Sequence, residues 1–392
     1  GRVGKEDEGF STTRRCATIL VPRLHTNLTG WLEQLVAEDY RVTVIVERRE
    51  PTERMIPSVQ VLTVRRYRLP LMSRMNPRSR HFQRLLSLAS VLSPSDLRKA
   101  ISLSCSDQVV ARLSIRPSSL LTWLQLKRLG VEVVAYTQDP LMRSPRAFVV
   151  VQIHRFMKLF GTRFITPVIN QDLENGRKRL SPLPNTRFVA FRPAQGFFQA
   201  GRMRTPPEQM NCLRILLVGK MEPRKRHKEM VVLLDSILDP HTRLKNVSVT
   251  IVGEASNRFD YDYLYELEAL VQESANQEVF KILVNRNHLE MPEIMSNHDL
   301  MLLPSVDEQA SVSNLEAMAA GCAVLCTRDS GTATYLRHGR DGLLVGREVS
   351  EWREALEVVL RNPEQCRSWG QNAMSRIQEL ADNASFIQNI EQ

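Results

Sequence analysis

The sequence predicts an α/β protein in which two doubly wound, parallel-sheet domains follow one another. Its 392 residues exceed what one typical core organises, and short apolar runs alternate with segments of helical periodicity. This series is interrupted at 201–212, where prolines and polar residues without periodicity indicate a linker. We therefore expect one domain over residues 1–204, a second over 205–375, and a helix over 376–392 that packs back on the first domain.

The first domain begins with a strand, a helix and a second strand, an order typical of parallel sheets. Leu129 and Gly130 end a later helix with the glycine that helix C-termini favour. The predicted strands are 17–22, 41–47, 107–115 and 131–137, and the predicted helices are 31–40 and 118–130.

The second domain repeats this alternation more regularly, and its carboxyl-terminal end, from Trp352 onward, is helical in pattern. The predicted strands are 213–219, 247–253, 279–285, 299–305 and 322–327. The predicted helices are 228–238, 261–274, 290–298 and 314–321. In such sheets ligands bind beyond the carboxyl ends of the strands, so the loops there are the candidate site.

Composition excludes some classes of protein. No apolar run approaches the roughly 18–20 residues of a membrane span, and no secretory signal is visible. The six cysteines are scattered, without the paired spacing or histidines of a zinc site, which favours reduced core thiols in a cytoplasmic protein.

Charge is divided unevenly along the chain. Residues 1–205 hold 34 of the 53 Lys and Arg residues but only 15 of the 43 Asp and Glu residues. The segment 65–86 alone has seven arginines among Leu, Met and Phe. It is consistent with an anionic membrane surface, with an anionic acceptor, or with a solvated face; no nucleic-acid motif accompanies it.

The first loop of the second domain, GKMEPRKRHK, is strongly basic. Gly219 permits close backbone approach, and Lys220, Arg224 and Lys225 follow within one turn. Such a cluster suits a diphosphate. The alternative is a solvated basic turn at the start of a helix.

The loop EQASVSNLEAMAAG places Glu308 and Glu316 around the start of a helix, with small residues between them. Backbone amides near Val312 and Ser313 would attract phosphate, and the two acids would accept hydrogen bonds from sugar hydroxyls. The alternative is structural: Ser313 and Glu316 have the spacing of a capping box, and Glu308 would be a surface acid.

These motifs together resemble family 4 retaining glycosyltransferases, which carry an E-x7-E motif. The resemblance rests on Pro304-Ser305, on Glu308 and Glu316 with the AMA and Gly that follow, on DGLL at 341–344, and on LLVGKMEPRK. It covers nearly all of 211–375 and is looser over 17–200.

The resemblance implies a GT-B fold of two Rossmann-like domains and a donor site in the second, without a bound metal or other cofactor. By position, Lys220 and Lys225 would neutralise the donor diphosphate and Glu316 would hold the ribose. Glu308 would hold the transferred sugar and stabilise positive charge at its anomeric carbon. The sequence itself places the nucleobase near Asn285 and Arg286.

Some positions depart from the family pattern. Thr29-Gly30 stands where Gly-Gly is frequent in the loop that approaches the donor phosphate, so Gly30 is the expected donor contact there. Gly331-x-x-Thr334 replaces a Gly-x-x-Glu. Instead of the usual histidine near the reacting centre the chain has Gln138-Asp139, so Asp139 is a candidate acceptor-side base. His25 is another candidate.

The expected function is transfer of a hexose or deoxyhexose from a UDP- or GDP-sugar. The acceptor would be a glycan or lipid-linked molecule in surface polysaccharide or glycolipid synthesis, at the inner face of the cell membrane. The alternatives are a non-catalytic GT-B-like binding or scaffold protein and a sugar-nucleotide epimerase of the same fold.

Overall fold

The computed structural model describes most of the chain. The described residues are 15–49, 56–67, 90–113, 117–138, 147–168, 170–171, 178–179, 186–205, 212–238 and 247–391. Two large sheets account for most of the described strands, and every strand pairing given within them is parallel. The predicted α/β class with doubly wound sheets is therefore confirmed.

The first sheet has seven strands in the order β11-β8-β7-β6-β1-β2-β3. Its strands are β1 (Cys16–Val21), β2 (Arg41–Val46), β3 (Val59–Thr63), β6 (Gln108–Arg112), β7 (Glu132–Tyr136), β8 (Arg163–Thr166) and β11 (Thr186–Phe188). The helices of this part are α1 (Thr29–Ala37), α3 (Pro94–Ser104), α4 (Pro117–Arg128) and α5 (Ala147–Leu159), whereas the next helix, α6 (Gln195–Arg202), packs against helices of the second sheet. Two short antiparallel pairs join β4 (Arg66–Tyr67) to β5 (Val91–Leu92) and β9 (Asn170–Gln171) to β10 (Lys178–Arg179).

The second sheet has six strands in the order β14-β13-β12-β15-β16-β17. Its strands are β12 (Leu213–Lys220), β13 (Val247–Glu254), β14 (Phe280–Val284), β15 (Leu300–Leu303), β16 (Ala323–Thr327) and β17 (Gly342–Val345). Its helices are α7 (His227–Ile237), α8 (Arg258–Glu273), α9 (Met291–Ser296), α10 (Ser313–Ala319), α11 (Val349–Arg361), α12 (Pro363–Asn383) and α13 (Phe386–Glu391). Short 3₁₀ turns lie at Pro223–Lys225, His288–Glu290 and Ala333–Tyr335.

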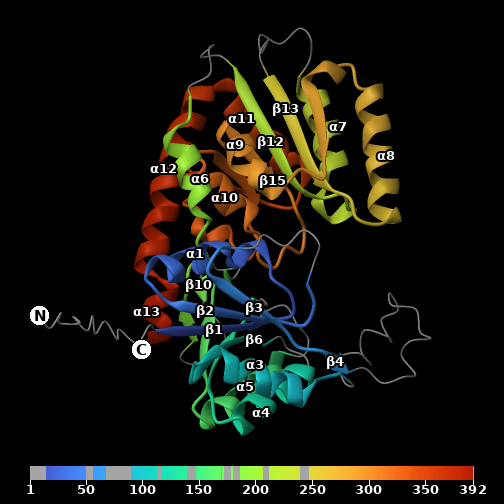
Figure 1. Cartoon of the computed structure of the whole chain (residues 1–392). Coiled ribbons are helices and arrows are strands. Elements are labelled where there is room, and N and C mark those ends of the chain that lie inside the picture. The colour runs from blue at the N-terminus through green and yellow to red at the C-terminus, as the bar shows by residue number, and fades with distance from the viewer. Residues whose placement is uncertain are drawn as a thin grey trace, which may run out of the picture. The chain divides into compact units, whose positions relative to one another are not determined.

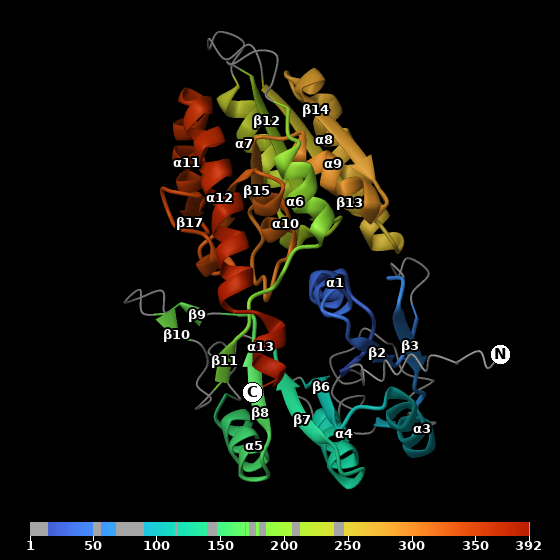
Figure 2. The ribbon, with the colours of Figure 1, turned by 60° about the vertical axis from the view of Figure 1, so that its left-hand side comes forward.

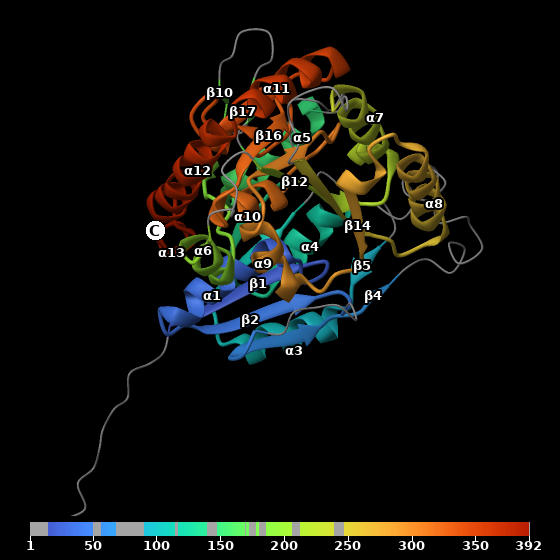
Figure 3. The ribbon, with the colours of Figure 1, turned by 90° about the horizontal axis from the view of Figure 1, so that it is seen from above.

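Helices cover both faces of the second sheet, as the near-continuous apolar strands require. Figure 3 shows α7 and α11 on one side of the strands and α6, α9 and α10 on the other. Alternate residues of β12, Leu213, Ile215 and Leu217, enter the core that α7, α8 and α11 close. Figure 1 shows α8 lying beside α7, and Figure 2 shows α6 close to α9 and α10.

The sequence-predicted elements are found with shifts of at most three residues at their ends, and Gly130 takes the left-handed conformation (φ 76°) expected of a helix C-terminus. Of the predicted linker 201–212, the first two residues belong to α6, and 206–211 lie outside the described residues. The sequence did not predict the strands β3, β8, β11 and β17 or the helices α3, α5 and α6.

The chain divides into two compact units. One comprises Gly1–Thr26, Leu32–Arg112 and Arg116–Val134; the other comprises Asn27–Trp31, Leu113–Ile115 and Ala135–Gln392. The predicted boundaries at 204/205 and 375/376 stay predictions, since compactness alone does not define folding domains.

Within the second unit, Trp31 is an aromatic anchor for the end of the chain. Its ring stacks on Phe386 of α13 with centroids 4.5 Å apart and on Phe191 at 5.6 Å. Its indole N–H donates to the Ala190 carbonyl over 2.8 Å. All three rings are almost fully buried, so the helix α13 is tied to residues from the first third and the middle of the sequence.

Candidate functional site

The candidate site lies where the strand order of the second sheet changes direction. From β12 the chain proceeds to β13 on one side, and β15 pairs with β12 on the other side. Doubly wound sheets bind ligands at such a point, beyond the carboxyl ends of the strands. The loops that leave β12 and β15 there are the basic loop 219–228 and the acidic loop 304–312.

The two loops are joined by a cluster of charges. The Glu308 carboxylate accepts hydrogen bonds from the Lys225 ammonium over 2.6 Å and from the Arg224 guanidinium over 2.9 Å. Arg224 also pairs with Glu222 at 2.7 Å, and its carbonyl accepts from the Val306 amide over 3.1 Å. The interpretation of the basic loop as a merely solvated turn is therefore wrong, as is that of Glu308 as a surface acid.

Glu308 is only 9% exposed. Burial by itself would raise its pKa, but the charges and hydrogen bonds of Lys225 and Arg224 outweigh burial and hold the pKa below its usual value. The carboxylate is thus ionised at neutral pH, and two cations sit against it.

Gly219 makes room for the Lys225 side chain. A Cβ built on Gly219 would lie 3.1–3.3 Å from the Cδ, Cγ and Cε atoms of Lys225, closer than ordinary van der Waals contact. The glycine therefore keeps the aliphatic part of Lys225 close to the strand end and so fixes the approach of its ammonium.

Replacing Gly219 with Ala is expected to displace Lys225 by a few tenths of an ångström and to weaken nucleoside diphosphate binding roughly tenfold, the effect of about 1.4 kcal/mol. Titration calorimetry would measure it. Lys225→Ala supplies the control: in that background Gly219→Ala should cause little further loss, because the clash has been removed. Additive losses would contradict a role through Lys225.

Glu316 occupies a different environment from Glu308. It is 6% exposed, and burial raises its pKa to about 8. The nearest basic group is His288, whose Nε2 lies 3.5 Å from Oε1. Glu316 is therefore mostly protonated at neutral pH, so it can donate as well as accept a hydrogen bond.

The capping-box alternative for Glu316 is wrong. The residue that caps α10 is Val312, and no side chain makes a cap hydrogen bond at that end. Ser313 is the first helical residue, and its hydroxyl lies 3.0 Å from the hydroxyl of Ser311. Sequence spacing alone misplaced the helix start by one residue.

Lys220 ends β12, and its charge reaches Asp260 of α8. Burial raises the pKa of Asp260, but hydrogen bonds from Ser256 and Asn257, with the charge of Lys220, keep it below its usual value. The side chain of Asn257 also accepts from the amides of Phe259 and Asp260 and so caps α8.

The predicted base-contacting residues lie after β14. Asn285 has a left-handed backbone (φ 52°), and its side chain bonds both the amide and the carbonyl of Ala255, at 2.9 and 3.0 Å. It thereby joins the loops after β13 and β14. Arg286 is exposed and lies 3.5 Å from Glu290. A base contact by either residue stays a prediction.

Gly30 has a packing role. A Cβ there would lie 2.0 Å from the carbonyl oxygen of Arg192 and 2.8 Å from that of Pro193. Thr29, beside it, is buried. Only glycine fits this close backbone approach, so the position is required structurally whether or not it touches a phosphate.

The two candidates for an acceptor-side base stay predictions. Asp139 lies outside the described residues. His25 is described, with its Nε2 2.9 Å from the Arg23 guanidinium.

Gly331 was quoted in the sequence motif, but its role was not foreseen. Its amide donates to the carbonyl of Glu308 over 3.1 Å, and a Cβ at this position would lie 1.7 Å from the carbonyl oxygen of Gln309. The loop after β16 therefore supports the backbone that carries Glu308. Arg224 was likewise seen only as a positive charge, and not as a ligand of Glu308.

Two features are absent from the described part of the chain. Among them no group of three or more His, Cys, Asp and Glu side chains has the arrangement of a metal site. No helix formed by them has the length and apolarity needed to cross a membrane.

Comparisons with known proteins relate the second half of the chain to glycosyl transferases. Residues 204–376 match the family model described as glycosyl transferases group 1. The chain is 28% identical over 229 residues to the lipopolysaccharide glucosyltransferase WaaG of Escherichia coli, covering 57% of this chain and 54% of that protein. It is 26% identical over 196 residues to a D-inositol 3-phosphate glycosyltransferase of Pseudarthrobacter chlorophenolicus, covering 50% and 45%. The chain thus spans about half the length of the curated relatives it matches.

Solved structures extend the likeness to nearly the whole chain. The structure of Anabaena Alr3699/HepE in complex with UDP superposes with a TM-score of 0.64 at 14% identity, covering 96% of this chain and 99% of that one. This likeness concerns the fold. Residues 204–376 are thus similar to the group 1 glycosyl transferases, and the chain has the GT-B fold of two doubly wound α/β sheets.

Proposed function

We propose that the protein is a retaining glycosyltransferase of family 4, using the E-x7-E acids Glu308 and Glu316. The donor would be a UDP- or GDP-linked hexose or deoxyhexose. The observation that carries the proposal is the ion cluster of Glu308 with Lys225 and Arg224 at the point where the strand order reverses. The match of 204–376 to group 1 glycosyl transferases supports it, as do structures of the similar HepE with UDP and with UDP-glucose.

The cluster suggests how a donor would bind. A diphosphate carries more negative charge than one carboxylate, so it would draw Lys225 and Arg224 toward itself, with Lys220 on the strand end beside them. The Glu308 carboxylate would then lose some of its hydrogen bonds from Lys225 and Arg224 and would lie next to the sugar. Glu316 would hold the ribose, which its mixed donor and acceptor character suits.

In the proposed reaction the bond between the anomeric carbon and the diphosphate oxygen breaks, and the acceptor oxygen bonds to the same carbon. The acceptor proton leaves to the diphosphate. Positive charge that develops on the sugar is stabilised by the Glu308 carboxylate, and negative charge on the diphosphate by Lys220 and Lys225. These cations supply the charge that a metal ion would otherwise provide, so we propose that no metal is required.

The acceptor side of the proposal rests on charge. A glycan or lipid-linked acceptor at the cytoplasmic face of a membrane would suit the strongly basic first half of the chain. Of the basic segment 65–86, residues 68–86 lie outside the described residues. Arg65 and Arg66 are paired with Asp96 and Glu47. Any membrane contact by the segment stays a proposal.

Thermal unfolding with a panel of nucleoside diphosphates tests the donor site. A diphosphate at 100 times its dissociation constant should stabilise the wild type by about 2.7 kcal/mol. Glu316→Ala should reduce this gain, each variant being compared with its own ligand-free state. Glu354→Ala, at an exposed acid of α11, is the matched control and should keep the full gain.

The outcomes separate the candidate functions. If no nucleotide stabilises folded protein, the transferase proposal is wrong. Stabilisation by one nucleotide without transfer or donor hydrolysis would favour a binding or scaffold protein. Conversion of the donor to an epimer without an acceptor, followed by NMR, would indicate an epimerase. NMR of the anomeric proton in a transfer product would decide between retention and inversion.

A further inference from the structure

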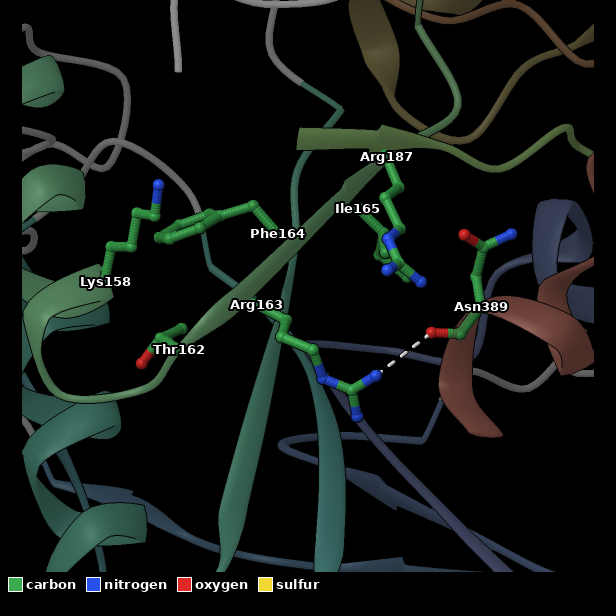
Figure 4. A pocket seen from close by; sticks show the side chains of 7 residues that line it. All are labelled: Lys158, Thr162, Arg163, Phe164, Ile165, Arg187 and Asn389. Carbon is green, nitrogen blue, oxygen red and sulfur yellow. Dashed lines mark hydrogen bonds between the residues drawn. The ribbon is translucent and has the colours of Figure 1, made fainter. Parts of the chain in front are cut away.

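A cavity of about 220 Å³ lies at the edge of the first sheet. None of its described lining residues belongs to the donor-site loops 219–228 and 304–312. It is lined by Lys158 from α5, Arg163 and Phe164 from β8, Arg187 from β11 and Asn389 from α13 (Figure 4). Among the described residues that line it, three are cationic and none is acidic. The cavity therefore favours an anionic group.

On its α13 side the cavity is bounded by Arg163 and its contacts with the α13 backbone. The Arg163 guanidinium reaches the carbonyl oxygens of Asn389 and Ile390, each over 3.5 Å. Figure 4 shows the Arg163 contact with Asn389 and the Arg187 guanidinium on the same side of the cavity, with Lys158 and Phe164 on the other. Two of its cations thus come from neighbouring strands, which fixes their spacing better than a loop would.

Exposed apolar side chains adjoin this cavity. The turn between α5 and β8 presents Leu159, which is 83% exposed, and Phe160, which is 55% exposed; Phe156, one turn earlier, is 47% exposed. The Phe156 and Phe160 rings lie against each other with centroids 4.9 Å apart. Large apolar side chains in water, next to a cationic pocket, are typical of an interface with another surface.

We propose that this turn and cavity, called here the α5–β8 patch (Phe156, Lys158, Leu159, Phe160, Arg163 and Arg187), bind a membrane surface containing anionic phospholipid. Leu159 and Phe160 would enter the boundary between headgroups and acyl chains. The cations would meet lipid phosphates, with one phosphate in the cavity.

The combination of cationic and exposed apolar side chains favours an anionic membrane surface over other ligands. A free phosphate would use the cations but leave Leu159 and Phe160 in water. A neutral surface would bury the apolar pair but offer no anionic group to the cationic lining of the cavity. A surface with anionic headgroups above hydrocarbon matches both features at once.

This inference does not depend on sugar transfer, because vesicle binding needs no donor. It also assigns the contact to residues different from the basic segment 65–86. The two assignments can be separated, since substitutions in the α5–β8 patch leave that segment intact.

Co-sedimentation of the full chain with phosphatidylglycerol and phosphatidylcholine vesicles, at about 0.1 M salt where the Debye length is about 10 Å, tests the proposal. The wild type should bind the anionic vesicles and not the neutral ones. The double variant Lys158→Glu, Arg187→Glu should weaken binding at least about tenfold. Each cation near an anionic surface strengthens binding, and here two cations are replaced by acids. Leu159→Ser with Phe160→Ser should weaken it by about as much.

Two control variants show whether the same changes of charge or apolar surface elsewhere on the protein also weaken vesicle binding. Lys281→Glu with Arg340→Glu makes the same change of net charge at exposed positions elsewhere. Phe259→Ser with Val358→Ser removes apolar side chains that are 59% and 51% exposed. Both controls should bind like the wild type, and circular dichroism with thermal unfolding would show that all variants are folded.

The proposal is overturned if folded patch variants bind anionic vesicles as tightly as the wild type. It is also overturned if the wild type binds neutral vesicles equally well. If millimolar inorganic phosphate, at constant ionic strength, stabilises the wild type while anionic vesicles do not bind it, the cavity is a site for free phosphate and the membrane assignment is wrong.

Discussion

Replacing Glu316 with Gln is expected to stabilise the ligand-free protein at pH 9 by roughly 4 to 5 kcal/mol. This free energy corresponds to the rise of the Glu316 pKa from 4.5 to about 8, at 1.36 kcal/mol for each pKa unit. The carboxyl is buried in the first turn of α10. At pH 9 the wild type must hold an ionised carboxylate there, whereas Gln remains neutral and has nearly the same shape. Urea unfolding at pH 5, 7 and 9 would measure the difference.

The sign follows from linkage. Burial raises the pKa of Glu316 in the folded state above its unfolded value, so the protonated form is favoured by folding. Wild-type stability therefore falls as pH rises from about 4.5 to about 8 and changes no further, as far as this group is concerned. The two proteins should be almost equally stable near pH 4.5 and diverge above it. A difference that does not vary with pH would contradict the raised pKa.

Glu308 provides the control of opposite sign. Lys225 and Arg224 hold its pKa below the usual value despite burial. Its contribution to stability is therefore present above the unfolded pKa of about 4.5 and is lost as pH falls through the folded value. Glu308→Gln should destabilise the protein at pH 7, because two cations lose their shared acceptor. The same chemical substitution at Glu308, in the loop before α10, and at Glu316, in the first turn of α10, is thus expected to act in opposite directions.

These opposite shifts bear on the proposed function. An ionised Glu308 suits stabilisation of positive charge on a sugar, whereas a protonated Glu316 suits hydrogen bonding to ribose hydroxyls. When the surroundings of two neighbouring acids shift their pKa values in opposite directions, the two acids can serve different roles in one site.

The sequence was sufficient for the general architecture because parallel strands buried on both faces leave near-continuous apolar runs. The β12 run LRILLVG and the β13 run VSVTIVG are of this kind. Strand β17, GLLV, is only four residues long and begins at a glycine, so the same criterion did not find it. Helix α6 is only eight residues long and has Gly at two of them, so its residues have little intrinsic preference for a helix.

The site was predictable only in part, for a related reason. Strand ends could be placed from the pattern, so the loops with Lys225 and Glu308 could be assigned to one edge of the sheet. Which charges meet depends on strand order: β15 lies beside β12 although β13 and β14 intervene in sequence. The contact of Glu308 with Arg224, and the burial that distinguishes Glu316, arise from this tertiary arrangement and leave no local signal.

Replacing Gly331 with Ala is expected to cost about 3 kcal/mol of stability, the upper part of the range for overpacking, and to abolish nucleotide stabilisation. The added methyl group would lie 1.7 Å from the Gln309 carbonyl oxygen and 3.0 Å from Val168 Cγ1. The obstacle is backbone, which cannot turn aside as a flexible side chain can. Because the Gly331 amide also holds the Glu308 carbonyl, relief of the clash must move the residue that anchors Lys225.

Gly196 offers the matched comparison. It lies in α6, where a Cβ would meet only Pro292 at the ordinary distance of 3.6 Å. Gly196→Ala should therefore leave stability unchanged or raise it by up to about 1 kcal/mol, since Ala favours helices. Thermal unfolding of both variants, with and without the diphosphate that stabilises the wild type, distinguishes a general glycine effect from a local one. If Gly331→Ala keeps the full ligand-induced gain, the loop after β16 does not position Glu308, and the cluster at the end of β12 must be held by Arg224 and Lys225 alone.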